Sequence, residues 1–132
     1  MSKFLTELSL DATLGGWIHD EPFEYQSDYL GTVIRVPPGE FTDLATVPTI
    51  VPRFIVDVGN GLTREPAAVH DPLCRDEYKI IYGISQYQAD RTFLEALLVV
   101  GVPRLHALVL FGFVAVYQIY KHKMNYWKAL EA

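Results

Sequence analysis

Two patterns of hydrophobic and polar residues divide the chain. In the first half, Phe23–Tyr25 and Thr32–Val36 alternate between apolar and polar side chains, which is typical of half-buried β-strands. Phe4 to Leu10 is a further amphipathic segment, and Pro38-Gly39 fits the centre of a type II turn. These features predict a small antiparallel sheet.

In the second half, apolar residues recur at spacings of three and four, which predicts about three helices. Pro66 suits the first turn of a helix with Ala67, His70, Leu73 and Cys74 on one face, and Pro72 should shorten or kink it. A second helix is predicted from Ser85, a good N-cap residue, to Gly101.

A last helix is predicted from Pro103 to about Lys123. Its unbroken apolar run, Ala107 to Tyr117, has eleven residues. A membrane span needs about 20. We therefore interpret it as a buried core helix rather than a membrane span, with attachment to a membrane or a partner helix as the alternative.

Composition narrows the class of protein. The chain has 132 residues, and half of them are hydrophobic, which predicts one α+β domain over residues 1–132, β-rich in 1–60 and helical in 64–123. A single cysteine excludes a disulfide framework and a cysteine-based zinc site. The net charge of −5 disfavours nucleic acid as a partner. The residues after Met1 lack the layout of a secretion signal, so we expect no secretion by a signal peptide.

The strongest candidates for chemistry are His70 and Asp90. Each lies on the apolar stripe of a predicted helix, and the two helices are consecutive. Since a buried carboxylate must find a donor, we expect Asp90 to pair with the ring of His70. Such a pair orients a catalytic base. The alternative is a helix-to-helix hydrogen bond without chemistry.

Two other acids are candidate metal ligands. Asp71 follows His70 directly and, at about 100° around the helix, points away from its ring. Asp43 follows the predicted turn, where it either caps the next turn or shares a Ca²⁺ ion with Asp71. We interpret Cys74 as a small core residue and His19 as a solvated turn residue.

The chain also resembles a known family, through motifs that extend from about Phe4 to Trp127. They are Trp17, Phe23, Tyr25, the segment Val36-Pro37-Pro38-Gly39-Glu40-Phe41-Thr42-Asp43-Leu44-Ala45-Thr46-Val47-Pro48, Ala67-Ala68-Val69-His70-Asp71, and Ala89-Asp90 with Phe93 and Leu97. The resemblance is to small proteins of unknown function that are encoded mainly by bacteriophages and prophages. It implies a virion or host-cytoplasm setting but no activity. The chain departs from the family pattern at Pro72 and Cys74, where aromatic residues are usual.

A shorter segment resembles the catalytic helices of calcium-dependent phospholipases. It comprises Ala67-Ala68-Val69-His70-Asp71 and, 20 residues after the histidine, Ala89-Asp90 with Phe93. The resemblance implies that His70 is the base, Asp71 holds Ca²⁺ and Asp90 orients the histidine. The glycine-rich calcium loop of those enzymes has no match here.

Two functions therefore remain open from the sequence. One is a virion- or tail-associated structural or adaptor protein whose partners are other phage structural proteins or a second copy of itself. The other is a Ca²⁺-assisted hydrolase of a lipid ester or a cell-envelope bond, with His70 and Asp90 as catalytic residues and Asp71 and Asp43 as metal ligands. A sealed His70 would favour the first function, and a His70 that opens to a cleft would favour the second.

Overall fold

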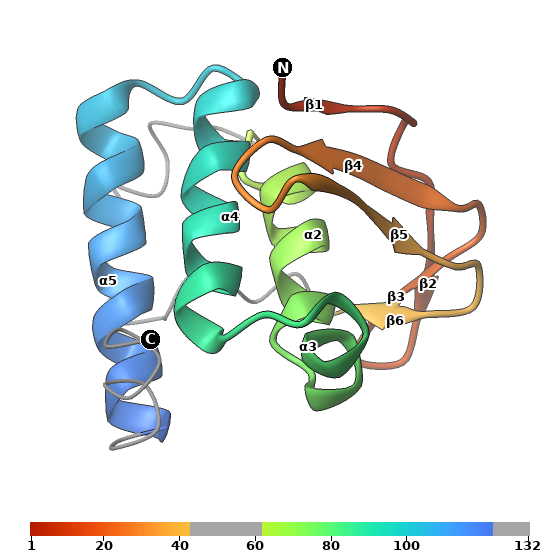
Figure 1. Cartoon of the computed structure of the whole chain (residues 1–132). Helices are drawn as coiled ribbons and strands as arrows, with labels where there is room; N and C mark the ends of the chain where they lie inside the picture. The colour runs from red at the N-terminus through yellow and green to blue at the C-terminus, as the bar shows by residue number, and fades with distance from the viewer. Residues whose placement is uncertain (43–61, 123–132) are drawn as a thin grey trace.

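A computed structural model describes residues 1–42 and 62–122 of the chain. The predicted loop around Asp43 and the end of the chain at Trp127 lie outside these residues. The described part is an α+β structure of small antiparallel sheets beside a group of helices (Figure 1), which confirms the predicted fold class.

The strands form two sheets rather than the single one predicted, each with three strands in the described residues. The first sheet has the order β1-β4-β5 and the second the order β2-β3-β6, with every pair antiparallel. Their bounds are β1 Lys3–Phe4, β2 Leu10–Thr13, β3 Gly16–His19, β4 Phe23–Ser27, β5 Thr32–Val36 and β6 Phe41–Thr42. The predicted strand from Phe4 to Leu10 is thus wrong, because its two ends pair in different sheets.

The period-two pattern of β4 and β5 places one face of the first sheet in the core, as predicted. Tyr25 pairs with Ile34, Phe23 pairs with Val36, and all four side chains are buried. Gly39 has a φ of 92°, which the predicted type II turn requires of its third residue.

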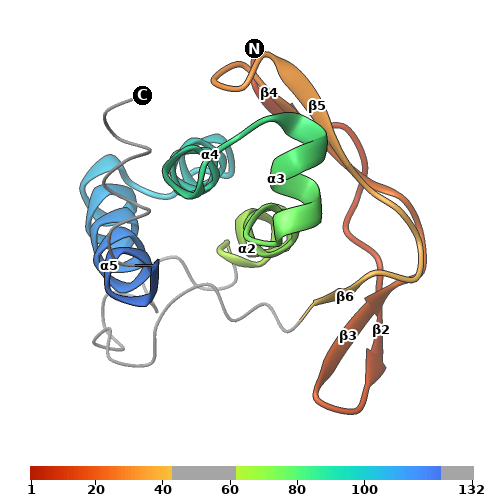
Figure 2. The ribbon, with the colours of Figure 1, turned by 60° about the horizontal axis from the view of Figure 1, so that its bottom comes forward.

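Four helices follow in the described residues, with α4 between α5 and α2, and with the sheets beyond α2 and α3 (Figures 1 and 2). Their bounds are α2 Arg64–Leu73, α3 Asp76–Tyr82, α4 Gln86–Val99 and α5 Arg104–His122. The short helix α3 was not predicted. It ends at Gly83 in the left-handed conformation, and Tyr78 is its only buried residue.

The helix α4 faces two hydrophobic clusters. Ala89 and Ala96 pack into a core shared with α2 and the first sheet, whereas Phe93 and Leu97 pack against α5. The alanines bring neighbouring elements close to the axis of α4, because they add almost no side-chain volume.

The helix α5 was expected to be a buried core helix, and it is buried on one face only. Ala107, Leu110 and Val114 are buried, but Leu105 and Tyr120 remain 71% and 81% exposed. No helix in the described part of the chain is long and apolar enough to cross a membrane.

Glu95 of α4 holds the first sheet against the helices. Its carboxylate accepts hydrogen bonds from the hydroxyls of Tyr25 and Ser27, both at 2.7 Å, and from the backbone N–H of Tyr29 at 2.9 Å. Tyr25 and Ser27 are buried, and burial together with the bond to Glu95 raises the pKa of Tyr25. No sequence pattern pointed to this anchor.

We expect Glu95→Ala to lower the free energy of unfolding by about 2–4 kcal/mol, because it leaves two buried hydroxyls without their acceptor. Urea denaturation measures this loss. Glu77→Ala, at an exposed position of α3, is the matched control and should change stability by less than about 0.5 kcal/mol. Equal losses in the two variants would contradict the anchoring role.

Candidate functional site

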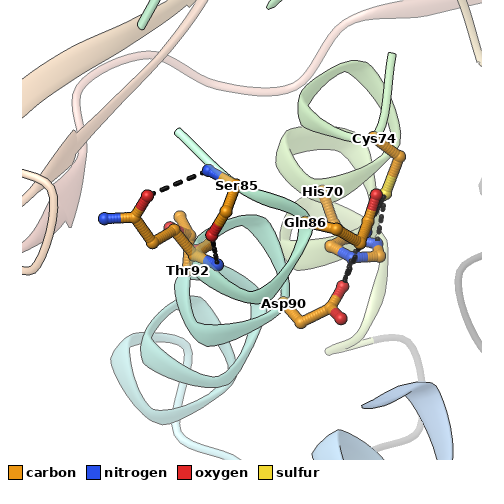
Figure 3. Close-up of polar contacts among 7 residues, drawn as sticks. His70, Cys74, Ser85, Gln86, Asp90 and Thr92 are labelled. Atoms are coloured by element: carbon orange, nitrogen blue, oxygen red, sulfur yellow. Dashed lines mark hydrogen bonds and ion pairs between the residues drawn. The ribbon is translucent and has the colours of Figure 1, made fainter. Parts of the chain in front are cut away.

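The candidate site lies where α2 and α4 pack side by side (Figure 3). The Nε2 atom of His70 and the Oδ1 atom of Asp90 are 2.7 Å apart, and their side chains are 2% and 0% exposed. The contact expected from the two apolar stripes is confirmed. The ring of His70 also packs against that of Phe93, with 5.2 Å between centroids.

The local sequence fixes where α4 begins and therefore where Asp90 points. The Ser85 hydroxyl accepts a hydrogen bond from the backbone N–H of Gln88, and the Gln88 side chain accepts one from the backbone N–H of Ser85. This capping box, drawn in Figure 3, confirms Ser85 as the N-cap residue. Asp90 follows one turn later and faces α2.

Two further side chains complete the site. The Sγ atom of Cys74 lies 3.3 Å from Nε2 and 3.6 Å from Nδ1 of His70. The Nε2 atom of Gln86 lies 3.3 Å from that sulfur and 3.0 Å from Oδ1 of Asp90. We call His70, Cys74, Gln86 and Asp90 the His70 cluster.

The interpretation of Cys74 as an inert core residue is corrected, because its sulfur is a direct neighbour of the candidate base and the residue is only half-buried. Helical spacing already placed Cys74 on the same face as His70, although its chemistry was not recognised. The same spacing could have revealed Gln86, which lies four residues before Asp90 on one face of α4.

The electrostatics of the cluster favour a protonated ring. Burial alone lowers the pKa of His70, but the charge of Cys74 and the hydrogen bonds with Asp90 and Cys74 outweigh burial and raise the pKa to about 10. These partners favour an ion pair of His70 with Asp90, buried between α2 and α4.

The arrangement does not form a cysteine–histidine–acid relay. In such a relay the acid holds one ring nitrogen while the nucleophile contacts the other. Here Asp90 and Cys74 both make their shortest ring contact with Nε2 of His70. The 2% exposure of the His70 side chain also leaves the ring closed to solvent.

Asp71, one of the predicted metal ligands, lies outside the cluster. Its carboxylate is 3.4 Å from the guanidinium of Arg75, which also binds Glu40 at 2.6 Å and the carbonyl oxygen of Phe41. Asp43, the other predicted ligand, is outside the described residues. The structure therefore does not test the expected calcium site.

His19 is buried rather than solvated, which corrects the expectation for the turn. It ends β3, is 1% exposed, and has no hydrogen bond to either ring nitrogen within the described part of the chain. Burial lowers the pKa of His19, against an opposing influence of Glu40.

The fold and the cluster define an α+β protein with a histidine–carboxylate pair buried between two helices. Residues 17–116 match the family described as protein of unknown function DUF1353, and the chain belongs to this family. No curated protein and no solved structure matches it.

We expect the free energy of unfolding to fall between about pH 6.5, the pKa of an unperturbed histidine, and pH 10. The folded state binds the His70 proton more tightly than the unfolded chain, so this stabilisation is complete below that range and is lost across it. The slope should reach about 1.4 kcal/mol per pH unit.

Urea denaturation at a series of pH values, with a chelator present, measures this slope. Asp90→Asn should reduce the slope and cost about 1–3 kcal/mol at neutral pH, since the ring loses one of the two groups that raise its pKa. Asp71→Asn, which alters the neighbouring carboxylate outside the cluster, should keep the slope. A parent protein whose stability is flat across the range would contradict a charged His70.

Proposed function

We propose that this protein is a non-catalytic structural or adaptor protein of a bacteriophage, associated with the virion or its tail. The observation that carries the proposal is the apolar outer face of α5. Leu105, Val116 and Tyr120 lie at helical spacing along this face and are 71%, 65% and 81% exposed. They lie opposite the buried residues of the same helix.

A helix that is apolar on both faces is the kind of element that another surface covers. The outer face carries no charged side chain between Leu105 and Tyr120. Its partner is therefore expected to be apolar at the contact. Other structural proteins of the particle, or a second copy of this chain, fit that description.

The closed His70 cluster supports the absence of catalysis. Its histidine and carboxylate are sealed between α2 and α4, where their bond stabilises the helix pair. The phage setting is supported by the resemblance to phage- and prophage-encoded proteins, and it implies the host cytoplasm before assembly and the virion afterwards. The acidic net charge of −5 makes nucleic acid a poor partner.

Purified particles of the encoding phage should contain the chain at a fixed copy number, measured by quantitative mass spectrometry. Val116→Glu should lower its incorporation about tenfold or more, because the new carboxylate loses water when a partner covers α5. Ile80→Glu is the matched control, since Ile80 is 80% exposed on α3 and away from this face. Absence from particles and assembly intermediates, or equal effects of the two variants, would contradict the proposal.

The short contact of His70 with Asp90 supports a second candidate, the Ca²⁺-assisted hydrolase of a lipid ester or a cell-envelope bond. In this function His70 is the base, Asp90 orients it, and Asp71 and Asp43 hold Ca²⁺. Substrate binding would have to expose the imidazole ring of His70, which is closed to solvent in this structure.

This candidate predicts that millimolar Ca²⁺ raises the thermal midpoint of the parent protein but not that of Asp71→Asn, because an ion held only by the native state stabilises it. It also predicts Ca²⁺-dependent hydrolysis of phospholipid vesicles that His70→Gln abolishes. If Ca²⁺ changes neither the midpoint nor the hydrolysis, the hydrolase is excluded and the structural function stands.

A further inference from the structure

We propose that the His70 cluster is a binding site for one Zn²⁺ ion, with Cys74, His70 and Asp90 as ligands. This site differs from the calcium site considered above and does not depend on the proposed structural function. It also corrects the expectation that a single cysteine excludes a cysteine-based zinc site, because here one thiolate acts together with a histidine and a carboxylate. The three ligand atoms, one sulfur, one ring nitrogen and one carboxylate oxygen, all lie within 4.8 Å of one another.

The spacing of these atoms suits one small ion. Zinc binds sulfur at about 2.3 Å and nitrogen or oxygen at about 2.0–2.2 Å, so ligands around one tetrahedral ion are about 3–4 Å apart. Sγ of Cys74 is already 3.3 Å from Nε2 of His70. Oδ1 of Asp90 is 2.7 Å from that nitrogen, so a small outward rotation of the carboxylate admits the ion.

Gln86 gives independent support for a cation in the cluster. Gln86 is 93% buried, yet its Oε1 atom has no hydrogen-bond partner in the described part of the chain. Its Nε2 atom meanwhile approaches the sulfur of Cys74 and the carboxylate of Asp90. Turning the amide by about 180° exchanges the two atoms and points the carbonyl oxygen at the cluster. A metal ion there takes this oxygen as a fourth ligand and replaces the Gln86 N–H as the partner of the Asp90 carboxylate.

The chemistry of the ligands selects the metal. A thiolate and a carboxylate supply two negative charges that balance a divalent cation, while His70 binds as the neutral imidazole. The ion therefore displaces the proton of the His70 ring and that of the Cys74 thiol, and both protons pass to solvent. Sulfur and imidazole nitrogen are ligands of Zn²⁺ and its softer neighbours, whereas Ca²⁺ and Mg²⁺ prefer oxygen. Since His70 lies in α2, Cys74 follows that helix directly as its C-cap residue and Asp90 lies in α4, the ion cross-links the two helices and stabilises their packing.

The test compares the chelator-treated protein with the same protein after addition of Zn²⁺ or Co²⁺. We expect one Zn²⁺ per chain by isothermal titration calorimetry and a thermal midpoint raised by about 4 °C or more. Co²⁺ should give a thiolate-to-cobalt charge-transfer band. Ca²⁺ should give no shift of the midpoint through this cluster.

Cys74→Ser should lower Zn²⁺ affinity about 100-fold or more and remove the cobalt band, because the thiolate is lost. Circular dichroism checks that this variant folds, and Asp90→Asn should weaken binding in the same way. Glu77→Gln, at an exposed position of α3, is the matched control and should bind Zn²⁺ like the parent. A parent that gives no Zn²⁺-dependent midpoint and no cobalt band, or a Cys74→Ser variant that binds like the parent, would overturn the zinc site.

Discussion

The packing of the helical half depends on the partners that replace water around the buried carboxylate of Asp90. Burying a charged carboxylate costs several kcal/mol unless charged and hydrogen-bonding partners replace the water. Gln86 supplies a donor from the same helix, and His70 supplies one from α2. Because the second donor belongs to another helix, α2 can pack on α4 at only one register without leaving the charge unpaired.

The helix α4 carries a second hydrogen-bonded carboxylate, that of Glu95, on another of its sides. Glu95 binds β4 and the turn after it, whereas Asp90 binds α2, and Phe93 and Leu97 pack on α5. The helix α4 therefore joins the first sheet, the helix pair and the last helix. Apolar contacts provide the buried area of this packing. The hydrogen bonds of the two carboxylates fix how the packed elements are oriented.

Local patterns predicted the parts of the fold that local physics determines. The alternation in Phe23–Ser27 predicted a strand because one face of β4 is buried. Ser85 could be predicted as the N-cap residue because its capping box lies within four residues. The pairing of His70 with Asp90 could be predicted because each is a polar residue on an apolar stripe, and few donors lie near the carboxylate of Asp90.

The parts of the fold that the sequence did not predict depend on contacts between residues that are distant in sequence. Nothing near Glu95 indicates that its partners lie 66 to 70 positions away in β4 and the following turn. His19 is buried where its ring stacks on that of Phe23 and its backbone bonds to Gly39 and Glu40, which lie 20 or more positions further along the chain. The division into two sheets likewise depends on which strands pair. Cys74 was missed for another reason, since its spacing from His70 was visible but no neighbouring group was recognised as one that could activate its thiol.

The sequence separation of these contacts has a consequence for the order of folding. The β4–β5 hairpin closes over a short turn, and the bond between His70 and Asp90 spans 20 positions. The bonds of Glu95 to β4 span up to 70, so a larger loss of chain entropy precedes them. The hairpin and the α2–α4 pair are therefore expected to form as separate units first, and Glu95 joins them in the last step.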